Sequence, residues 1–216
     1  MSIAWEDVKL LRNSPVFNEI PVHERDELLD ELNARVRVLE KGRTLCRAGE
    51  GLDFFPVVLE GRMQASLPQG GCDREVSTFG PGESFAEAVP HTLKHSPVNI
   101  RALELTRLLC IPASGLDESS NPYAYVLREN LSNEMSKKIG KLSQTLSVVG
   151  EPRLRDRVLA HLRTLPTDSR GWMEIQHSRS EWAAYLRVAE KSLIRELSAL
   201  QQEGVIEVDG HRIRFV

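Results

Sequence analysis

The sequence predicts an α+β protein in which an antiparallel β-roll precedes a long helix and a small winged helix-turn-helix domain. Short β-prone runs separated by glycines fill residues 35–110, a heptad pattern follows residue 121, and a helix pair with a β-hairpin closes the chain. These patterns predict an N-terminal domain at 1–120, a connecting helix at 121–150 and a C-terminal domain at 151–216.

The composition limits the functional class. With 216 residues and 41% hydrophobic content, the chain has room for two ordinary globular cores. The net charge of −3 excludes a polybasic nucleic-acid binder, so any contact with nucleic acid needs a local basic face. The N-terminal residues lack the pattern of a signal peptide, and no run approaches the length of a membrane span. We therefore expect a cytoplasmic protein without membrane contact.

The three cysteines, Cys46, Cys72 and Cys110, are far apart in the sequence. An odd number with this spacing suits neither a disulfide framework nor a CxxC metal or redox site. We expect reduced structural thiols and no metal site, while a single redox-sensing thiol stays open as an alternative.

The N-terminal half changes from helical to β texture. Leucines at helical spacing, interrupted by Pro15 and Pro21, predict short helices in the first thirty or so residues. Beyond Arg35, runs such as 54–59 and 63–67 alternate with glycines. Because glycine supplies the positive φ of tight turns, this texture predicts an antiparallel roll or barrel.

A long helix is predicted to begin at Asn121 and Pro122, since asparagine caps a first turn and proline suits its first position. Its apolar residues recur at spacings of four and three, which form the seam of a two-stranded coiled coil. The expected dimer interface comprises Leu131, Met135, Ile139, Leu142, Leu146 and Val149. The alternative, a helix packed on its own roll, asks for a wider apolar stripe. Gly150 and Pro152 end the helix.

A helix-turn-helix is predicted near the C-terminus. Residues 178–181, Ser-Arg-Ser-Glu, have the pattern of a capping box that opens a short helix. A tight turn at 187–189 leads to a second helix that begins at Glu190 and stops before Gly204. Two short helices joined in this way are typical of a helix-turn-helix.

A wing is predicted after the second helix. Two β-prone runs flank the dipeptide 209–210, Asp-Gly, which is typical of a two-residue type I′ turn. Alternation turns Ile213 and Phe215 inward. It leaves Arg212 and Arg214 facing outward, where they could meet a phosphate backbone. For each arginine taken alone, a solvated surface charge is the alternative.

Four features follow one another along the sequence: segment 82–88 (GESFAEA), segment 96–104 (SPVNIRALE), the coiled-coil helix and the winged motif at 178–215. In these features and their order the chain resembles the CRP/FNR superfamily of bacterial transcription regulators. The resemblance covers essentially the whole chain. It implies a cyclic-nucleotide-binding-like double-stranded β-roll as sensor and a dimerisation helix. It also implies a homodimer that reads a pseudo-palindromic operator of two half-sites, with one recognition helix in each major groove. RNA polymerase is a further expected partner.

The resemblance also indicates the DNA contacts. The expected DNA-binding residues are Ser178, Arg179, Glu190, Lys191, Ser192, Arg195, Arg212 and Arg214. Many members of the superfamily read bases with a glutamate and an arginine four residues apart, and here Lys191 replaces the glutamate while Arg195 keeps the arginine. Glutamate suits the cytosine amino group whereas lysine suits guanine, so the operator should differ from the common half-site. Ala189 replaces the usual hydroxyl cap of this helix, at a cost of about 1 kcal/mol.

The expected effector pocket comprises Gly82, Glu83, Ser84, Phe85, Ser96, Pro97, Ile139 and Leu142. In cAMP receptors of the superfamily an arginine-serine pair holds the cyclic phosphate, and here residues 95–97 read His-Ser-Pro. Ile139 and Gly140 stand where a Thr-Ser pair would bind adenine. We therefore do not expect cAMP as effector. For Glu83 two roles stay open: it anchors the effector, or it is an ordinary turn residue.

The cofactor expectations follow from the same comparison. The iron–sulfur cluster of the FNR branch is not expected, because no cysteine precedes Cys46. A haem stays open, with His23, His91, His95, Cys46 and Cys72 as candidate axial ligands, each of which has a surface or packing role as its alternative. The effector is expected to be a small molecule or a gas, bound directly or sensed through haem or redox chemistry.

Two other functional classes compete with this interpretation. A cyclic-nucleotide-binding-like regulatory module without DNA binding is disfavoured by the wing and its arginines. An enzyme is disfavoured because no Ser/His/Asp constellation, metal-ligand spacing, Walker motif or dinucleotide fingerprint is visible. Glu87 and His91 lie at helical spacing but carry no catalytic pattern. No catalytic residue is therefore expected.

Overall fold

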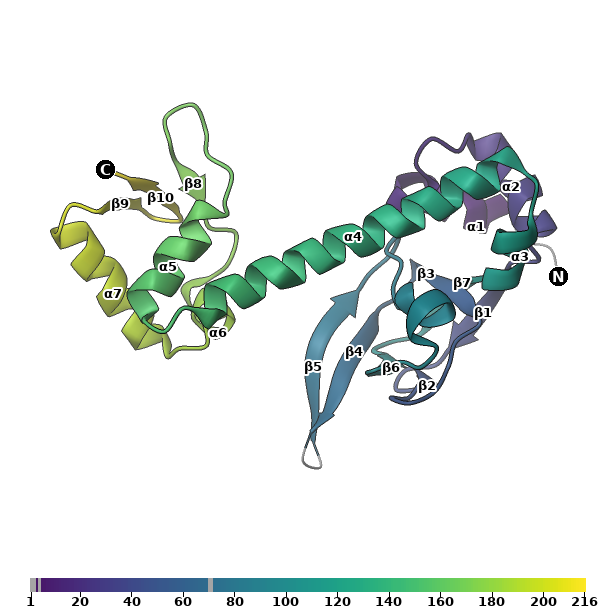
Figure 1. The fold of residues 1–216 in the computed structure, drawn as a ribbon, viewed down its shortest axis with the longest axis horizontal. Coiled ribbons are helices and arrows are strands. Elements are labelled where there is room, and N and C mark those ends of the chain that lie inside the picture. The colour runs from purple at the N-terminus through teal and green to yellow at the C-terminus, as the bar shows by residue number, and fades with distance from the viewer. Residues whose placement is uncertain (1–2, 4, 70–71) are drawn as a thin grey trace. The chain divides into compact units, whose positions relative to one another are not determined.

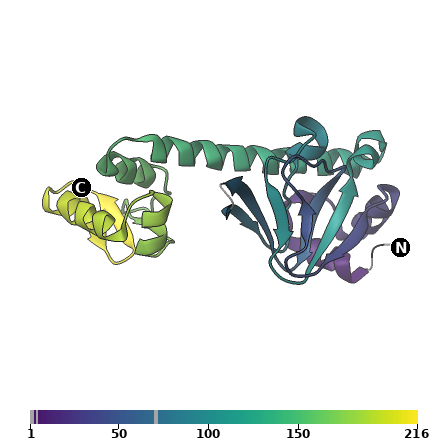
Figure 2. The ribbon, with the colours of Figure 1, turned by 90° about the horizontal axis from the view of Figure 1, so that it is seen from below.

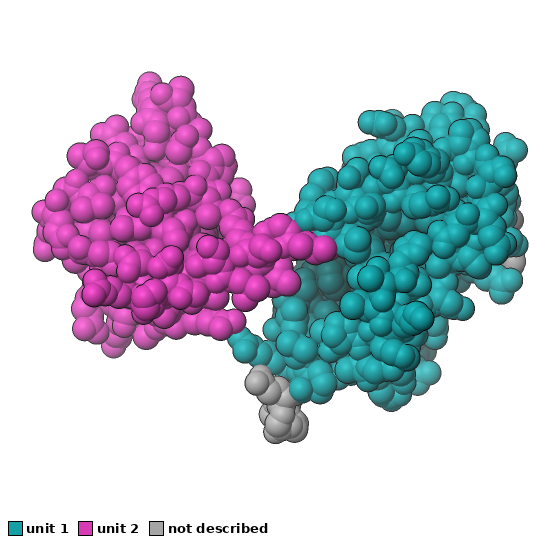
Figure 3. All heavy atoms as spheres, viewed as in Figure 1, with its two compact units in different colours: residues 1–137 teal, residues 138–216 magenta. Residues whose placement is uncertain are grey.

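The computed structural model describes Ile3, residues 5–69 and residues 72–216; the side chains of Trp5, Gln69 and Cys72 lie outside this description. The chain divides into two compact units, which we call unit 1 (residues 1–137) and unit 2 (residues 138–216; Figure 3). Unit 1 holds an antiparallel roll and unit 2 a winged helix-turn-helix, so the predicted α+β architecture is confirmed. None of the helices within the described ranges has the length and apolar character needed to cross a membrane.

Short helices precede the roll in unit 1. They are α1 (Trp5–Leu10), the 3-10 turns η1 (Leu11–Asn13) and η2 (Pro15–Phe17), and α2 (Val22–Glu31). The buried Arg25 fixes this segment, because its guanidinium donates to the carbonyls of Leu11, Phe17 and Ile20, each at 2.9 Å. Pro15 opens η2 and Pro21 precedes α2, as the sequence predicts.

Two antiparallel sheets form the roll (Figure 2). The strands are β1 (Arg35–Leu39), β2 (Thr44–Cys46), β3 (Phe54–Glu60), β4 (Met63–Gln69), β5 (Cys72–Phe79), β6 (Asn99–Ala102) and β7 (Thr106–Pro112). Their orders are β1-β7-β3 and β2-β6-β4-β5. Alternate residues of β3 serve two cores: Phe55 and Val57 pack with the helices, whereas Val58 packs with Phe85 between the sheets. The π-helical turn η3 (Val89–Leu93) and α3 (Ala113–Glu118) complete the unit.

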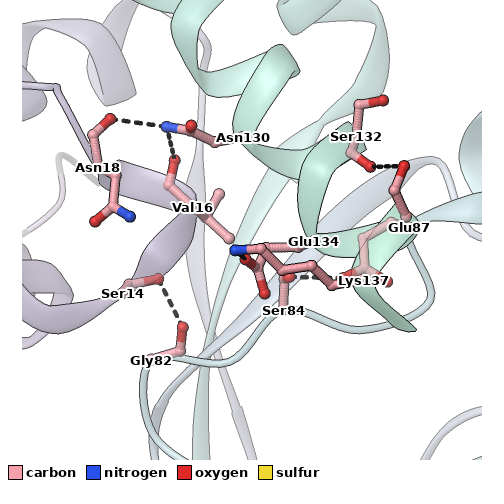
Figure 4. A network of polar contacts seen from close by, with 11 residues as sticks. Ser14, Val16, Asn18, Gly82, Ser84, Glu87, Asn130, Ser132, Glu134 and Lys137 are labelled. Carbon is pink, nitrogen blue, oxygen red and sulfur yellow. Dashed lines mark hydrogen bonds and ion pairs between the residues drawn. The ribbon is translucent and has the colours of Figure 1, made fainter. Parts of the chain in front are cut away.

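Helix α4 (Pro122–Gly150) contributes residues to both units (Figure 1). Asn121 caps it as predicted, since its Oδ1 accepts from the Tyr123 amide at 2.9 Å. Within unit 1, Asn130 Nδ2 donates to the carbonyls of Val16 at 3.0 Å and Asn18 at 2.8 Å (Figure 4). The first turns of α4 are therefore fastened to the N-terminal helices of unit 1.

Unit 2 contains the predicted helix pair and hairpin. Its elements are α5 (Leu154–Arg163), β8 (Met173–Glu174), α6 (Arg179–Tyr185), α7 (Glu190–Gln202), β9 (Ile206–Asp209) and β10 (Arg212–Phe215). The strands pair in the order β8-β10-β9. Trp182 of α6 is fully buried with Leu193 and Leu197 of α7 and Ile213 of β10, so one core fixes both helices against the hairpin.

Candidate nucleic-acid interface and effector site

The predicted capping box at the start of α6 is confirmed. Ser178 Oγ accepts from the Glu181 amide at 3.2 Å, and Glu181 Oε2 accepts from the Ser178 amide at 2.8 Å. These bonds lower the pKa of the Glu181 carboxyl below its usual value. The Ser178 hydroxyl also donates to Glu181, so it is engaged in the cap.

The turn between α6 and α7 is a Schellman motif built on an arginine. Arg187 has φ 57°, and its amide donates to the Ala184 carbonyl at 3.1 Å. The Val188 amide donates to the Ala183 carbonyl at 3.0 Å. This turn lies where the sequence predicts it and lets α7 begin at Glu190.

Helix α7 has a buried and an exposed face. Leu193, Leu197 and Leu200 enter the core of unit 2. Lys191 and Arg195, one turn apart, are exposed and form no ion pair with any residue that the structure describes. Ser192 is half-buried beside them and Glu190 is exposed, and Ala189 provides no side-chain cap, as predicted. Two unpaired cations near the start of an exposed helix can reach base edges in a major groove.

The acidic residues on the flank of α7 are neutralised from α5. Arg155 Nε lies 3.0 Å from Glu196 Oε1, and its Nη2 lies 2.6 Å from Glu203 Oε1. The hydrogen bond from Arg155 lowers the pKa of the Glu203 carboxyl. The carboxylates of Glu196 and Glu203 are therefore held by α5, which leaves Lys191 and Arg195 as the charged groups on the middle of the exposed face.

Arg179 points toward the wing. Its Nη2 donates to the Gly210 carbonyl at 2.7 Å, and its guanidinium lies 5.5 Å from the centroid of the Trp182 ring. Burial lowers the pKa of this guanidinium. Arg179 thus fastens α6 to the turn of the wing, and a phosphate contact would compete with this bond.

The wing has a different register from the predicted one. Arg212 pairs with Asp209 and Ile213 with Val208, so the two-residue loop is Gly210-His211 and the predicted Asp209-Gly210 turn is wrong by one residue. Gly210, at the first loop position, has φ 59°, which is typical of a type II′ turn. Ile213 is buried as predicted, whereas Phe215 at the strand end is 40% exposed.

The ring of Trp172, a residue that the sequence analysis does not predict as functional, contacts the two arginines of the wing. The guanidinium carbons of Arg212 and Arg214 lie 5.4 and 4.8 Å from the centroid of its ring. Arg212 also pairs with Asp209, and Arg214 with Glu207. A half-buried tryptophan just before β8, the strand that pairs with β10, was the available signal.

The predicted dimer seam of α4 is only partly exposed. Leu131 is 3% exposed and belongs to the core of unit 1, so it packs within its own chain and lies outside any open seam. Met135 and Val149 are half-buried. The exposed apolar residues of the seam are Ile139 at 56%, Leu142 at 59% and Leu146 at 57%. The first half of α4 therefore packs on its own roll, whereas the residues that follow form an exposed apolar stripe.

Family comparisons agree with this architecture. A cyclic nucleotide-binding domain model matches residues 36–120, and a Crp-like helix-turn-helix domain model matches residues 156–216. The chain belongs to the CRP/FNR superfamily of bacterial transcription regulators. This regulator is therefore a sequence-specific DNA-binding protein, as predicted.

Individual relatives cover most of this regulator. It is 27% identical over 196 residues to the transcriptional activator protein FnrA of Stutzerimonas stutzeri, covering 88% of this chain and 80% of the relative. It is 28% identical over 197 residues to the transcriptional activator protein Anr of Pseudomonas protegens, with the same coverage. A solved CooA variant from Carboxydothermus hydrogenoformans shares the fold with a TM-score of 0.53 at 17% identity, covering 88% of this chain and 85% of that one.

The loop that holds the first predicted effector residues is stabilised internally. Glu83 is exposed, and its Oε2 accepts from the Gly80 amide at 2.7 Å. The Gly82 carbonyl accepts from Ser14 Oγ at 2.6 Å (Figure 4). Both residues therefore shape a turn and its contact with the N-terminal segment, which is the alternative that the sequence left open for Glu83.

The neighbouring residues also have partners within the roll. Ser84 Oγ donates to Glu87 Oε1 at 2.6 Å, and both residues are buried. Phe85 is fully buried and stacks on Phe79 with ring centroids 5.1 Å apart. Ala86, between Phe85 and Glu87, has φ 56°, a backbone conformation that favours glycine. Glu87, rather than Glu83, is thus the buried carboxylate of this loop.

The remaining predicted effector residues do not join one site. The buried Ser96 Oγ donates to the Val98 carbonyl at 2.8 Å and accepts from the Val98 amide at 3.3 Å, while Pro97 is exposed. Ile139 and Leu142 belong to unit 2. The serine hydroxyl is therefore engaged, and residues 95–97 supply no guanidinium, so this loop does not fit a cyclic phosphate.

A different cavity in unit 1 is lined by both the roll and α4. Its volume is about 350 Å³. Its lining includes Phe55, Glu87, His91, Leu116, Arg128, Leu131, Ser132 and Met135. Figure 4 shows the Glu87 side chain directed toward Ser132 of α4. Glu87 and His91 were visible as a spaced pair in the sequence, but their position beside α4 depends on the tertiary fold.

The two described thiols, Cys46 and Cys110, do not fit a metal or redox sensor. Cys46 and Cys110 are buried, and burial raises the pKa of both, that of Cys110 to about 12. Metal ligation and oxidation need the thiolate, which such burial disfavours. Within the described ranges no group of three His, Cys, Asp or Glu side chains could hold a metal ion. The prediction for Cys72 concerns a side chain outside the described part.

The candidate haem ligands are dispersed. His23, His91 and His95 are all exposed; His91 Nδ1 lies 3.9 Å from Asp117, and the His91 ring contacts Phe55. Of these three, His91 lines the 350 Å³ cavity. His91 is therefore the one of these three exposed histidines that borders a cavity.

Proposed function

We propose that this regulator acts as a homodimer that places one α7 helix in each of two successive major grooves of a pseudo-palindromic operator. The exposed stripe of Ile139, Leu142 and Leu146 supports the dimer, because apolar side chains at this spacing pair in a two-stranded coiled coil. The chromosomal DNA partner implies a cytoplasmic location, and promoter binding implies RNA polymerase as a further partner.

The single observation that carries the DNA interface is the exposed pair Lys191 and Arg195 on α7, neither of which forms an ion pair with a residue that the structure describes. In this proposal both read base edges, with Glu190 and Ser192 beside them at the groove. Arg212 and Arg214 contact phosphates and must exchange their carboxylate partners to do so. Ser178 and Arg179 contribute to DNA binding indirectly. The Ser178 side chain caps α6, and the Arg179 side chain fastens α6 to the wing turn.

Operator selection from random duplexes tests this interface. Lys191→Glu should shift the preferred half-site toward cytosine at the contacted position, because a carboxylate accepts from the cytosine amino group. Gln201→Glu, which introduces the same carboxylate at the far end of α7, is the control and should keep the wild-type motif. Identical motifs from the wild type and Lys191→Glu would show that Lys191 does not read bases. Failure of every variant to enrich a motif would favour a regulatory module without DNA binding.

The proposed effector is a molecule other than cAMP. The engaged hydroxyl of Ser96 and the lack of a guanidinium at residues 95–97 support this. Calorimetric titration with cAMP should show no tight binding, and a sub-micromolar affinity would overturn the proposal. Mass spectrometry and an absorbance spectrum of the purified protein would then reveal a co-purified small molecule or haem. We propose the cavity beside Glu87 as its site, since ligand there would touch the roll and α4 together.

A further inference from the structure

We propose that Ile194 is a specificity-determining residue that contacts the C5 methyl group of a thymine in each half-site. The proposal rests on the α7 interface described above. It adds an apolar base contact to the polar contacts of Lys191 and Arg195.

The exposure of Ile194 is unusual for its helix. The side chain is 46% exposed, whereas Leu193, Leu197 and Leu200 of α7 are buried. Isoleucine is β-branched and has a lower helix propensity than the polar residues common at exposed helix positions. Neither core packing nor helix propensity therefore accounts for an isoleucine at this position.

The position of Ile194 places it on the interface. It lies three residues after Lys191 and four before Ser198, so these side chains are neighbours on one surface of α7. The Ser198 hydroxyl donates to the Ile194 carbonyl at 3.0 Å, which directs it back onto its own helix. The exposed surface thus combines two cationic donors with an apolar group beside them.

The chemistry of the major groove selects the partner. Thymine presents a methyl group there, whereas cytosine presents an amino donor. Isoleucine can bury the methyl group, but against cytosine it would remove the amino donor from water without offering an acceptor. Ile194 should therefore favour thymine at a base pair adjacent to those read by Lys191 and Arg195.

Replacing single thymines by deoxyuridine tests this contact, because it removes the methyl group and keeps the hydrogen-bonding edge. With the selected operator and fluorescence anisotropy at fixed salt, the wild type should lose about threefold to fivefold in affinity at one thymine per half-site, the effect of one buried methyl-sized group. Ile194→Ala should bind the thymine operator more weakly and lose this sensitivity to deoxyuridine. Ser198→Ala, on the same surface, should keep it.

Two results would overturn the proposal. One is a wild type that tolerates deoxyuridine at every thymine of its operator, and the other is an Ile194→Ala variant with undiminished sensitivity. Thermal unfolding should show that the variant is folded, and Ile194→Val, which keeps two methyl groups, should retain part of the effect. If the wild type selects no operator at all, the α7 interface itself is wrong, which is a distinguishable failure.

Discussion

The exposed face of α7 and the predicted effector loops of unit 1 use their polar side chains in opposite ways. Lys191 and Arg195 have no ionic partner among the described residues and are open to a ligand. Glu83 and Ser96 instead bond backbone groups of their own loops. Helix periodicity predicts which residues face out, whereas polar residues in loops are commonly engaged by the local backbone. A polar residue in a loop is therefore weaker support for a ligand site than one on an exposed helix face.

Helix α4 likewise combines residues engaged within the chain with residues open to a partner, and substitutions in it should have the largest effects on stability and operator binding. Leu131→Glu buries a charge in the core of unit 1 and should cost about 4 kcal/mol or more of stability. Leu142→Glu should leave the fold of each unit intact but dissociate the dimer, weakening operator binding about a hundredfold or more through lost bivalency. Light scattering, thermal unfolding and operator titration separate the two effects.

Gln144→Glu, on the exposed side of α4 opposite the seam, is the matched control and should keep both mass and affinity. If the wild type scatters light as a single chain at micromolar concentration, the exposed stripe is not a dimer seam. If Leu142→Glu unfolds the protein as Leu131→Glu does, the two halves of α4 do not differ as described.

His161 extends the comparison to a polar group buried in the core of unit 2. Burial lowers its pKa from 6.5 to about 4, and its Nδ1 has no hydrogen-bond partner within the described structure. The unfolded chain binds a proton at His161 more readily than the folded chain does. The contribution of His161 to the free energy of unfolding is therefore fully present above about pH 6.5 and is lost as the pH falls toward 4. The loss should reach about 3 kcal/mol.

Urea unfolding at pH 7 and pH 4, followed by tryptophan fluorescence, measures this loss. His161→Phe keeps the tilted ring contacts with Trp182 and Tyr185 and should flatten the pH dependence of stability. His177→Asn removes an exposed histidine nearby and should retain most of it. If the free energy of unfolding fell by the same amount between pH 7 and pH 4 in the wild type and in His161→Phe, His161 would not be the source of the pH dependence.

Truncating one residue from each region sharpens the comparison directly. Arg195→Ala should weaken specific operator binding by about 1–3 kcal/mol without changing thermal stability. Ser96→Ala should lower stability by about 1 kcal/mol, because two backbone groups of Val98 lose their partner, and leave operator preference unchanged. A destabilised Arg195→Ala or a fully stable Ser96→Ala would reverse the roles given to these two regions.

Trp172→Ala should give the smallest effect. Without the ring, Arg212 and Arg214 lose a stacking platform worth about 0.5–1 kcal/mol at an exposed site. Operator and random DNA should therefore both bind about twofold to fivefold more weakly, with the same preferred sequence. Trp172→Phe should recover part of the loss. A changed sequence preference would indicate that the wing reads bases.

Much of the fold follows from local pattern. The capping box at Ser178, the turn before Glu190 and the cap at Asn121 depend on neighbours within a few residues, so the sequence alone determines them. The continuous apolar run of β3 and the spacing of the leucines in α7 likewise indicate which side chains are buried. Lys191, Arg195 and the wing were predictable for this reason.

Tertiary structure decided the features that depend on distant partners. Leu131 meets the roll while Leu142 does not, although both fit one heptad pattern, because only contact with the sheet separates them. The one-residue shift of the wing arises because a hairpin register is set by pairing across two strands, and Asp-Gly in the sequence fits more than one register. The stacking of Trp172 with Arg212, and the place of Glu87 beside α4, join residues about forty apart, and no local pattern records such contacts.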